Sequence, residues 1–132
     1  MARTHQRSYV KGDRAQTRAY SPAVITQGGT VVWLAGQTGG EDEAGRSLAG
    51  DFDAQVRETF RRIGKTLEQA GGTLADLVTM TVFITDSRLG TRFTELRREI
   101  LRDDFPASAL ITCDGLAQPQ LLLEIQAIAV IG

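Results

Sequence analysis

The strongest constraint on the fold is a helical apolar pattern that ends at a glycine pair and is followed by an alternating pattern. The helical members are Phe52, Val56, Phe60, Ile63, Leu67 and Ala70. Asp51 or Asp53 can cap the start of this helix, and Gly71-Gly72 ends it. After a short turn, Val78, Met80, Val82 and Ile84 alternate with Thr79, Thr81 and Phe83. This stretch predicts a strand with one fully apolar face, so the chain must combine helix and sheet.

The remaining elements complete a predicted order of strand, helix, strand, helix, strand, strand. Thr30 to Leu34 indicates a buried strand, with Trp33 in the core. Asp86 or Ser87 can cap a second helix, whose apolar stripe is Leu89, Phe93, Leu96 and Ile100, and Pro106 lies beyond its end. Further strands are predicted near 109–113, with Cys113 as a small core residue, and at 121–131. Residues 1–19 are polar and basic, which favours a loose or edge-forming lead-in before a single domain over 20–132.

The closing strand predicts a partner for the chain. One face, formed by Leu123, Ile125, Ala127, Ala129 and Ile131, suits packing under the two helices. The opposite face, formed by Leu122, Glu124, Gln126, Ile128 and Val130, is mostly apolar, and no third helix is predicted to cover it. We expect another subunit to cover it. A carboxylate at Glu124 would then be suited to moving protons, although a Glu and a Gln at an exposed rim would also fit the pattern.

Composition excludes several classes of function. The chain has 132 residues, 42% of them hydrophobic, which suits one domain with one core. A formal net charge of -1 gives no overall attraction to nucleic acid or to anionic membranes. One cysteine and one histidine, His5, cannot form a zinc site or an internal disulfide. With no apolar run long enough to span a bilayer, a cytoplasmic location without membrane contact is expected.

Several strings, in order, resemble the Rid family (YjgF-type, reactive intermediate deaminases). The opening strings are Tyr20-Ser21-Pro22-Ala23-Val24, then Gly28-Gly29, then Ala35-Gly36-Gln37-Thr38. The later ones are Thr81-Val82-Phe83-Ile84-Thr85-Asp86, Phe105-Pro106-Ala107-Ser108, and Leu123-Glu124-Ile125-Gln126-Ala127-Ile128-Ala129-Val130. The resemblance runs from about residue 20 to residue 130 and agrees with the predicted order of elements.

This resemblance implies an α+β fold of the chorismate-mutase-like type, with a mixed sheet covered on one face by two helices. It also implies a homotrimer in which the sheets meet in a central barrel, with a small-molecule ligand in each intersubunit cleft. Family members with deaminase activity hydrolyse short-lived imines and enamines of amino acids to 2-oxo acids and ammonia, without cofactor or metal. In those proteins an arginine after Pro-Ala holds the substrate carboxylate, and a glutamate of the closing strand handles a proton or water.

Carried over by position, the resemblance assigns the glutamate to Glu124 and the pocket tyrosine to Tyr20, and it includes Gly36 in the same pocket. Three positions depart from the family pattern, because Ser108 replaces the arginine, Ala35 a serine and Thr94 an asparagine. Serine cannot supply the charged, two-pronged carboxylate contact of arginine. We therefore expect poor activity on the usual 2-imino acids. Arg97 or Arg92 could supply a substitute cation, although each also fits a solvated helix face.

Two functions follow from these residues, in order of preference. The first is a cofactor-free deaminase or related hydrolase of a small imine or enamine, with Glu124 as acid/base. The alternative is a non-catalytic module that binds a small molecule in the same cleft. A ribonuclease, a name also given to this family, is less expected, because the chain lacks a net basic charge and the paired histidines common in RNA hydrolysis.

Overall fold

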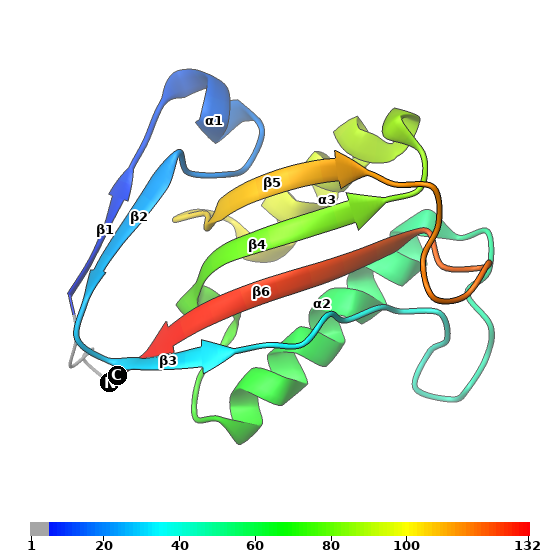
Figure 1. Cartoon of the computed structure of the whole chain (residues 1–132), viewed down its shortest axis with the longest axis horizontal. Helices are drawn as coiled ribbons and strands as arrows, with labels where there is room; N and C mark the ends of the chain where they lie inside the picture. The colour runs from blue at the N-terminus through cyan, green and yellow to red at the C-terminus, as the bar shows by residue number, and fades with distance from the viewer. Residues whose placement is uncertain (1–5) are drawn as a thin grey trace.

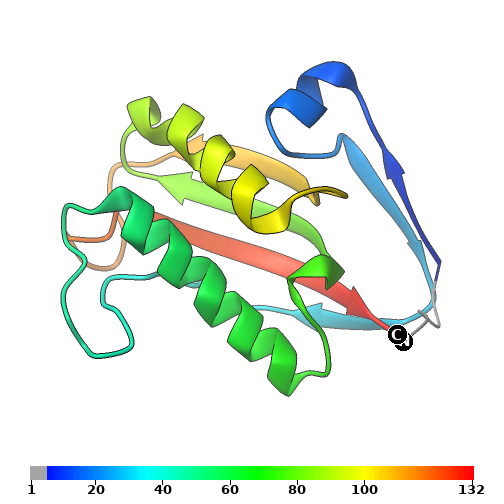
Figure 2. The same cartoon turned by 180° about the vertical axis from the view of Figure 1, so that it is seen from behind.

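Two helices cover one face of a four-stranded sheet. The computed structural model describes residues 6–132. Helix α2 (Phe52–Gln69) and helix α3 (Gly90–Leu101) lie on the same side of the sheet (Figures 1 and 2). The strand order is β3-β6-β4-β5, formed by β3 (Thr30–Trp33), β6 (Leu123–Ile131), β4 (Leu77–Ile84) and β5 (Ala107–Thr112). β6 runs antiparallel to both its neighbours, whereas β4 and β5 are parallel and connected through α3. The predicted α+β class is confirmed.

A capping aspartate begins helix α2, and a glycine pair ends it. The Asp51 side chain accepts a hydrogen bond from the backbone N–H of Ala54 (3.0 Å), so Asp51, and not Asp53, is the cap. At the other end Gly71 adopts a φ of 89°, a left-handed conformation that favours glycine, and the Gly72 N–H donates to the Leu67 carbonyl (2.8 Å). Both boundaries were predicted from the sequence.

The core lies between α2, α3 and the helix-facing side of β4 and β6. Val56, Ile63, Leu67, Leu123 and Ile125 are all fully buried, as their spacing predicted. Each such side chain contributes about 1.5–3 kcal/mol through removal of apolar surface from water.

The predicted alternation of inward and outward residues is wrong at the start of strand β4. Its pairing with β6 shifts between Leu77 and Thr79, so Leu77 is buried and Val78 is only half-buried. From Met80 onward the predicted alternation holds. A bulge leaves no mark in a hydrophobic pattern this short.

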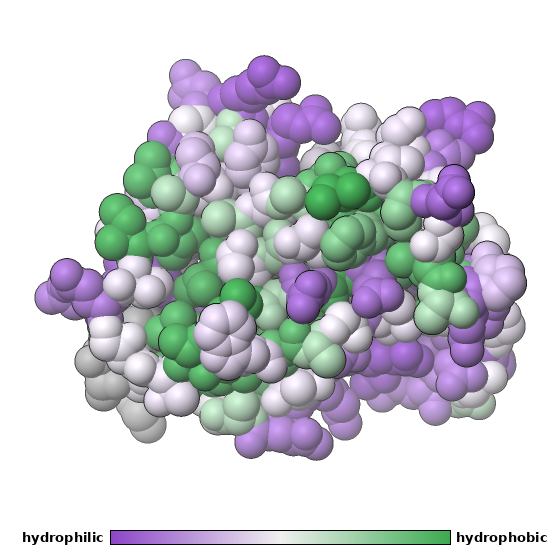
Figure 3. Space-filling view, viewed as in Figure 1, coloured by the Kyte–Doolittle hydropathy of each residue, from purple (hydrophilic) through white to green (hydrophobic). Residues whose placement is uncertain are grey.

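The helix-free face of the sheet exposes large apolar side chains, visible as green patches over the strands in Figure 3. Trp33 is 77% exposed, Val31 47% and Ile111 43%. The predictions of a buried strand at 30–34 and a core Trp33 are therefore wrong, because β3 is an edge strand and Trp33 lies on its open face. Cys113 is half-buried, not a core residue.

The polar start of the chain is ordered from Gln6 onward. Strand β1 (Gln6–Val10) pairs antiparallel with β2 (Ala23–Gln27), and the short helix α1 (Asp13–Thr17) lies between them. The Arg7 guanidinium donates to the backbone carbonyls of Val130 (2.6 Å) and Ala75 (2.7 Å). These contacts tie β1 to the end of β6, so from Gln6 onward the lead-in takes the edge-forming alternative and not the loose one.

Two short 3-10 turns complete the fold. η1 (Leu74–Asp76) precedes β4, and η2 (Ser87–Leu89) precedes α3. The Asp86 side chain caps η2 by accepting from the Arg88 N–H (2.9 Å). Within residues 6–132 no helix combines the length and apolar character needed to cross a bilayer.

Candidate functional site

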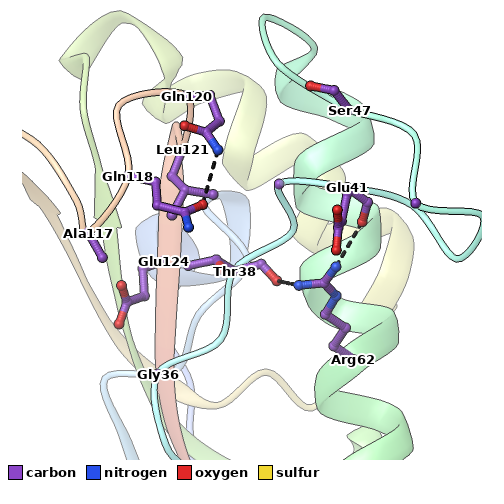
Figure 4. Close-up of a pocket in the computed structure, with 12 residues that line it drawn as sticks. Gly36, Thr38, Glu41, Ser47, Arg62, Ala117, Gln118, Gln120, Leu121 and Glu124 are labelled. Carbon is purple, nitrogen blue, oxygen red and sulfur yellow. Dashed lines mark hydrogen bonds between the residues drawn. The ribbon is translucent and has the colours of Figure 1, made fainter.

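Glu124 lines a cavity of about 640 Å³ between β6, the loop that follows β3 and the loop that precedes β6. Its neighbours in the strand, Leu123 and Ile125, point toward the helices and are fully buried, so Glu124 points the other way. The side chain is half-buried and forms no ion pair with any residue from 6 to 132. We call this cavity the Glu124 pocket; its lining includes Gly36, Thr38, Arg62, Gln118, Gln120 and Glu124 (Figure 4).

Gly36 lets the carboxylate approach the backbone closely. A Cβ atom at this position would lie 2.0 Å from Glu124 Oε2, a distance that real atoms do not adopt. The bridge between Gln37 and Ile125, with N–H to carbonyl distances of 2.8 and 2.9 Å, holds the segment beside β6. Gly36 and Glu124, both of which the resemblance assigns to the site, therefore lie against each other.

Two polar side chains of α2, the half-buried Arg62 and the buried Gln55, fix the loops that wall the Glu124 pocket. Arg62 donates to the carbonyls of Thr38 (3.0 Å) and Glu41 (2.8 Å), as the dashed lines in Figure 4 show. Gln55, fully buried, donates to the carbonyls of Leu48 (3.1 Å) and Gln120 (3.0 Å). The sequence reasoning missed both residues, since a polar residue on a helix gives no sign that distant loops need its hydrogen bonds.

Arg62 is itself held by a carboxylate. Glu58, 7% exposed, accepts from Arg61 (2.6 Å) and from Arg62 (2.8 Å). The hydrogen bond from Arg61, together with that from Arg62, lowers the pKa of Glu58 below its ordinary value. The carboxylate thus stays ionised and keeps Arg62 aimed at the loop.

A second, smaller cavity of about 200 Å³ lies at the β5 edge beside α3. We call it the Arg97 cavity, and it is lined by Arg18, Tyr20, Thr94, Arg97, Ser108 and Leu110. Four of the predicted site residues, Tyr20, Thr94, Arg97 and Ser108, meet here. Tyr20 is placed by the next residue, because Ser21 donates from its N–H to Pro106 (3.1 Å) and from its hydroxyl to Phe105 (2.6 Å), at the start of β5.

Arg97 is buried in this cavity. It is 2% exposed, lies over the Phe93 ring at 5.0 Å and donates from Nη1 to Ser108 Oγ (2.6 Å). The solvated helix face considered for Arg97 is therefore excluded. The alternative of a solvated helix face holds instead for Arg92, which is exposed and pairs with Asp53 (2.5 Å). Burial lowers the pKa of Arg97 to about 10, and the nearby Arg18 charge adds to this effect.

The side chains of Ser108 and Glu124 lie on opposite faces of the sheet. Ser108 is paired with Met80, whose side chain faces the helices, whereas Glu124 is paired with Phe83 on the other face. One copy of the chain therefore cannot bring Ser108 and Glu124 to the same small molecule. Ala35 is exposed beside Gly36 and offers only a methyl group.

This fold and this arrangement of residues match known proteins. The family described as "Endoribonuclease L-PSP" matches residues 12–131 of the chain. The chain belongs to the Rid (YjgF-type) family.

Solved structures of Rid proteins support this membership. RidA from the Antarctic bacterium Psychrobacter sp. PAMC 21119 is 32% identical, with a TM-score of 0.71 and coverage of 85% of this chain and 88% of that one. A YjgF/YER057c/UK114 family member from Mycobacterium tuberculosis is also 32% identical, with a TM-score of 0.68 and coverage of 96% and 100%. YyfB from Yersinia pestis, a Rid protein of unknown function, has a TM-score of 0.81 at 24% identity, over 95% and 98% of the two chains, and shows the shared fold.

In this Rid-family chain, the residue at position 108 is a serine that contacts an arginine of helix α3. Ser108, which the resemblance aligns with the family arginine, accepts a hydrogen bond from Arg97 of the adjacent helix. A guanidinium therefore occupies the space next to β5, although it comes from α3. The sequence carried a signal for this: Arg97 lies four residues after the buried Phe93 and one after the buried Leu96, on the inward side of the helix.

Proposed function

We propose that this protein is a cofactor-free deaminase that hydrolyses small imines or enamines, with Glu124 as the acid/base. The observation that carries the proposal is the position of the Glu124 carboxylate. It lies against the Gly36 backbone in a cavity large enough for a metabolite, and it forms no ion pair with any residue from 6 to 132. A carboxylate placed in this way can take and return a proton.

The proposed reaction needs only water and one proton carrier. Water adds to the carbon of the protonated C=N bond as Glu124 removes a proton from the water, which gives a tetrahedral amino alcohol. Glu124 returns this proton to the nitrogen and takes the hydroxyl proton as the C–N bond breaks, and the products are the carbonyl compound and ammonia, which then receives the proton held by Glu124. General acid–base catalysis of this type contributes about 10²–10⁴ in rate.

We propose further that the site is completed by a second copy in a homotrimer. Support comes from the exposed apolar side chains of the helix-free face, including Trp33, Val31 and Ile111. Their burial between subunits would also bring the β5 edge of one copy toward the Glu124 pocket of the next. Two cavities that no single copy can join would then line one cleft.

The test is the substitution Glu124→Gln, which keeps the shape of the side chain and removes the titratable group. An imine is generated in situ with an amino acid oxidase, and the loss of its absorbance is followed with and without the protein. We expect turnover to fall about a hundredfold or more, with the mass by light scattering unchanged. Turnover equal to that of the parent would overturn the role of Glu124.

A non-catalytic binding module is the second candidate, favoured by the absence of the family arginine at Ser108. The imine assay, together with calorimetry of the carbonyl product, separates the two functions. A binding module would bind the carbonyl product by calorimetry and yet leave the spontaneous decay of every imine tested unchanged.

A further inference from the structure

We propose that Gln55 of α2 is a positioning residue for the Glu124 pocket, because its amide joins the two loops that wall the pocket and sets the space between them. One loop, residues 34–51, follows β3, and the other, residues 113–122, precedes β6. We call them the β3 loop and the β6 loop. Gln55 does not line the pocket, so it acts through the backbone of these loops. Because the pocket is the site proposed for the reaction, this role of Gln55 rests on the proposed function and deepens it.

The Gln55 side chain binds the backbone of both loops at once. It is fully buried, and both the nitrogen and the oxygen of its amide are used. Nε2 donates to the Leu48 carbonyl of the β3 loop (3.1 Å) and to the Gln120 carbonyl of the β6 loop (3.0 Å). Oε1 accepts from the N–H of Leu122 (2.9 Å), at the end of the β6 loop. One side chain therefore holds the two loops at a fixed separation.

These two loops carry most of the pocket wall. Backbone groups in loops have no strand partner, so without Gln55 the three groups that it binds would be left unpaired or open to water. The β3 loop supplies Thr38, Glu41 and Ser47 to the lining, and the β6 loop supplies Gln118, Gln120 and Leu121. A change at Gln55 should therefore loosen both walls together.

The contact between α2 and the β3 loop is close around Gln55. A Cβ atom at Gly39 would lie 2.6 Å from the Gln55 carbonyl oxygen, so the loop backbone rests directly on this turn of the helix. Arg62 holds the same loop one step further along, through the carbonyls of Thr38 and Glu41. Both of these carbonyls belong to the β3 loop, whereas Gln55 reaches both loops.

The reacting carboxylate is held by different contacts. Glu124 belongs to β6, which is fixed by its pairing with β3 and β4. Gly36 is held beside β6 by the bridge between Gln37 and Ile125. Removal of Gln55 should thus leave the carboxylate in place and disturb the walls that contact the rest of the substrate. A change of this kind raises KM and leaves kcat nearly unaltered.

The experiment compares the parent with Gln55→Met, which keeps the length of the side chain and removes the amide. Gln69→Met, at an exposed glutamine of the same helix, is the matched control. Hydrogen exchange followed by mass spectrometry should show at least tenfold faster exchange in both loops of Gln55→Met, with α3 and β4 as protected as in the parent. In the imine assay, KM should rise about tenfold with kcat within about threefold of the parent. The control should match the parent in both measurements.

Faster exchange in only one loop, or in neither, would overturn the proposal. A fall in kcat at unchanged KM would also overturn it, because that is the effect of a smaller folded fraction. If Gln55→Met does not fold, Gln55→Ala replaces it under the same criteria, since the smaller side chain lets water reach the three backbone groups. A parent without imine turnover would reject the proposed reaction, and hydrogen exchange would still decide the role of Gln55.

Discussion

An arginine placed at position 108, where the resemblance to the Rid family predicts one, should destabilise this protein unless Arg97 is removed at the same time. Arg97 Nη1 lies 2.6 Å from Ser108 Oγ, so Ser108→Arg would bring a second guanidinium against the first. Two such charges about 5 Å apart repel by about 3 kcal/mol at an effective dielectric constant of about 20. The larger side chain would add the cost of overpacking a small cavity. Ser108→Arg alone should therefore lower the free energy of unfolding by about 3 kcal/mol or more.

The exchange variant, Arg97→Ser with Ser108→Arg, tests this reasoning. It keeps one cation and one hydroxyl in the cavity, so most of the loss should be recovered. Urea unfolding of the parent, both single variants and the exchange variant, at one protomer concentration, gives the coupling free energy. We expect about 3 kcal/mol. Additivity within about 0.5 kcal/mol would refute the idea that the two positions share one charge site.

Three further predictions concern other parts of the molecule. Gly36→Ala should reduce turnover about tenfold or more with the fold retained by circular dichroism, because the new Cβ would lie 2.0 Å from Glu124 Oε2 and displace the carboxylate; parental turnover would contradict this. Trp33→Lys should lower the mass measured by light scattering, since a 77% exposed tryptophan becomes a charge on the apolar face, and an unchanged mass would place the interface elsewhere. The Arg88 contacts lower the pKa of Asp86 from 3.8 to about 2, so its stabilising effect is complete above pH 3.8 and is lost as the pH falls toward 2. Asp86→Asn should flatten that part of the acid unfolding curve, and an unaltered curve would argue against the cap.

The sequence predicted the parts of the fold that local patterns determine. The apolar stripe of α2, its Asp51 cap and the helix-facing residues of β6 repeat with regular spacing, and each was found where expected. The errors arose where long-range structure decides. The composition of residues 30–34 does not reveal that β3 is at the sheet edge, so Trp33 was placed in the core. The ordered β1 was missed because Arg7 binds carbonyls more than sixty residues away.

The candidate site was predicted residue by residue, but its division into two cavities was not. The resemblance assigned Tyr20, Gly36, Thr94, Ser108 and Glu124 to one pocket, whereas in one copy of the chain Gly36 and Glu124 line one cavity and the other three line a second. It could not show that the two groups lie on opposite sheet faces, because that depends on strand register.

The separation of Ser108 and Glu124 on opposite faces has a genetic consequence. If each functional cleft takes Glu124 from one copy and Arg97 from its neighbour, two inactive variants can rescue each other. In a trimer that mixes Glu124→Gln with Arg97→Gln subunits, one of the three clefts receives both intact residues. Random assembly of equal amounts should then restore about a quarter of the parental turnover, as the symmetry of a closed ring requires. Such complementation would be impossible for a site contained within one chain.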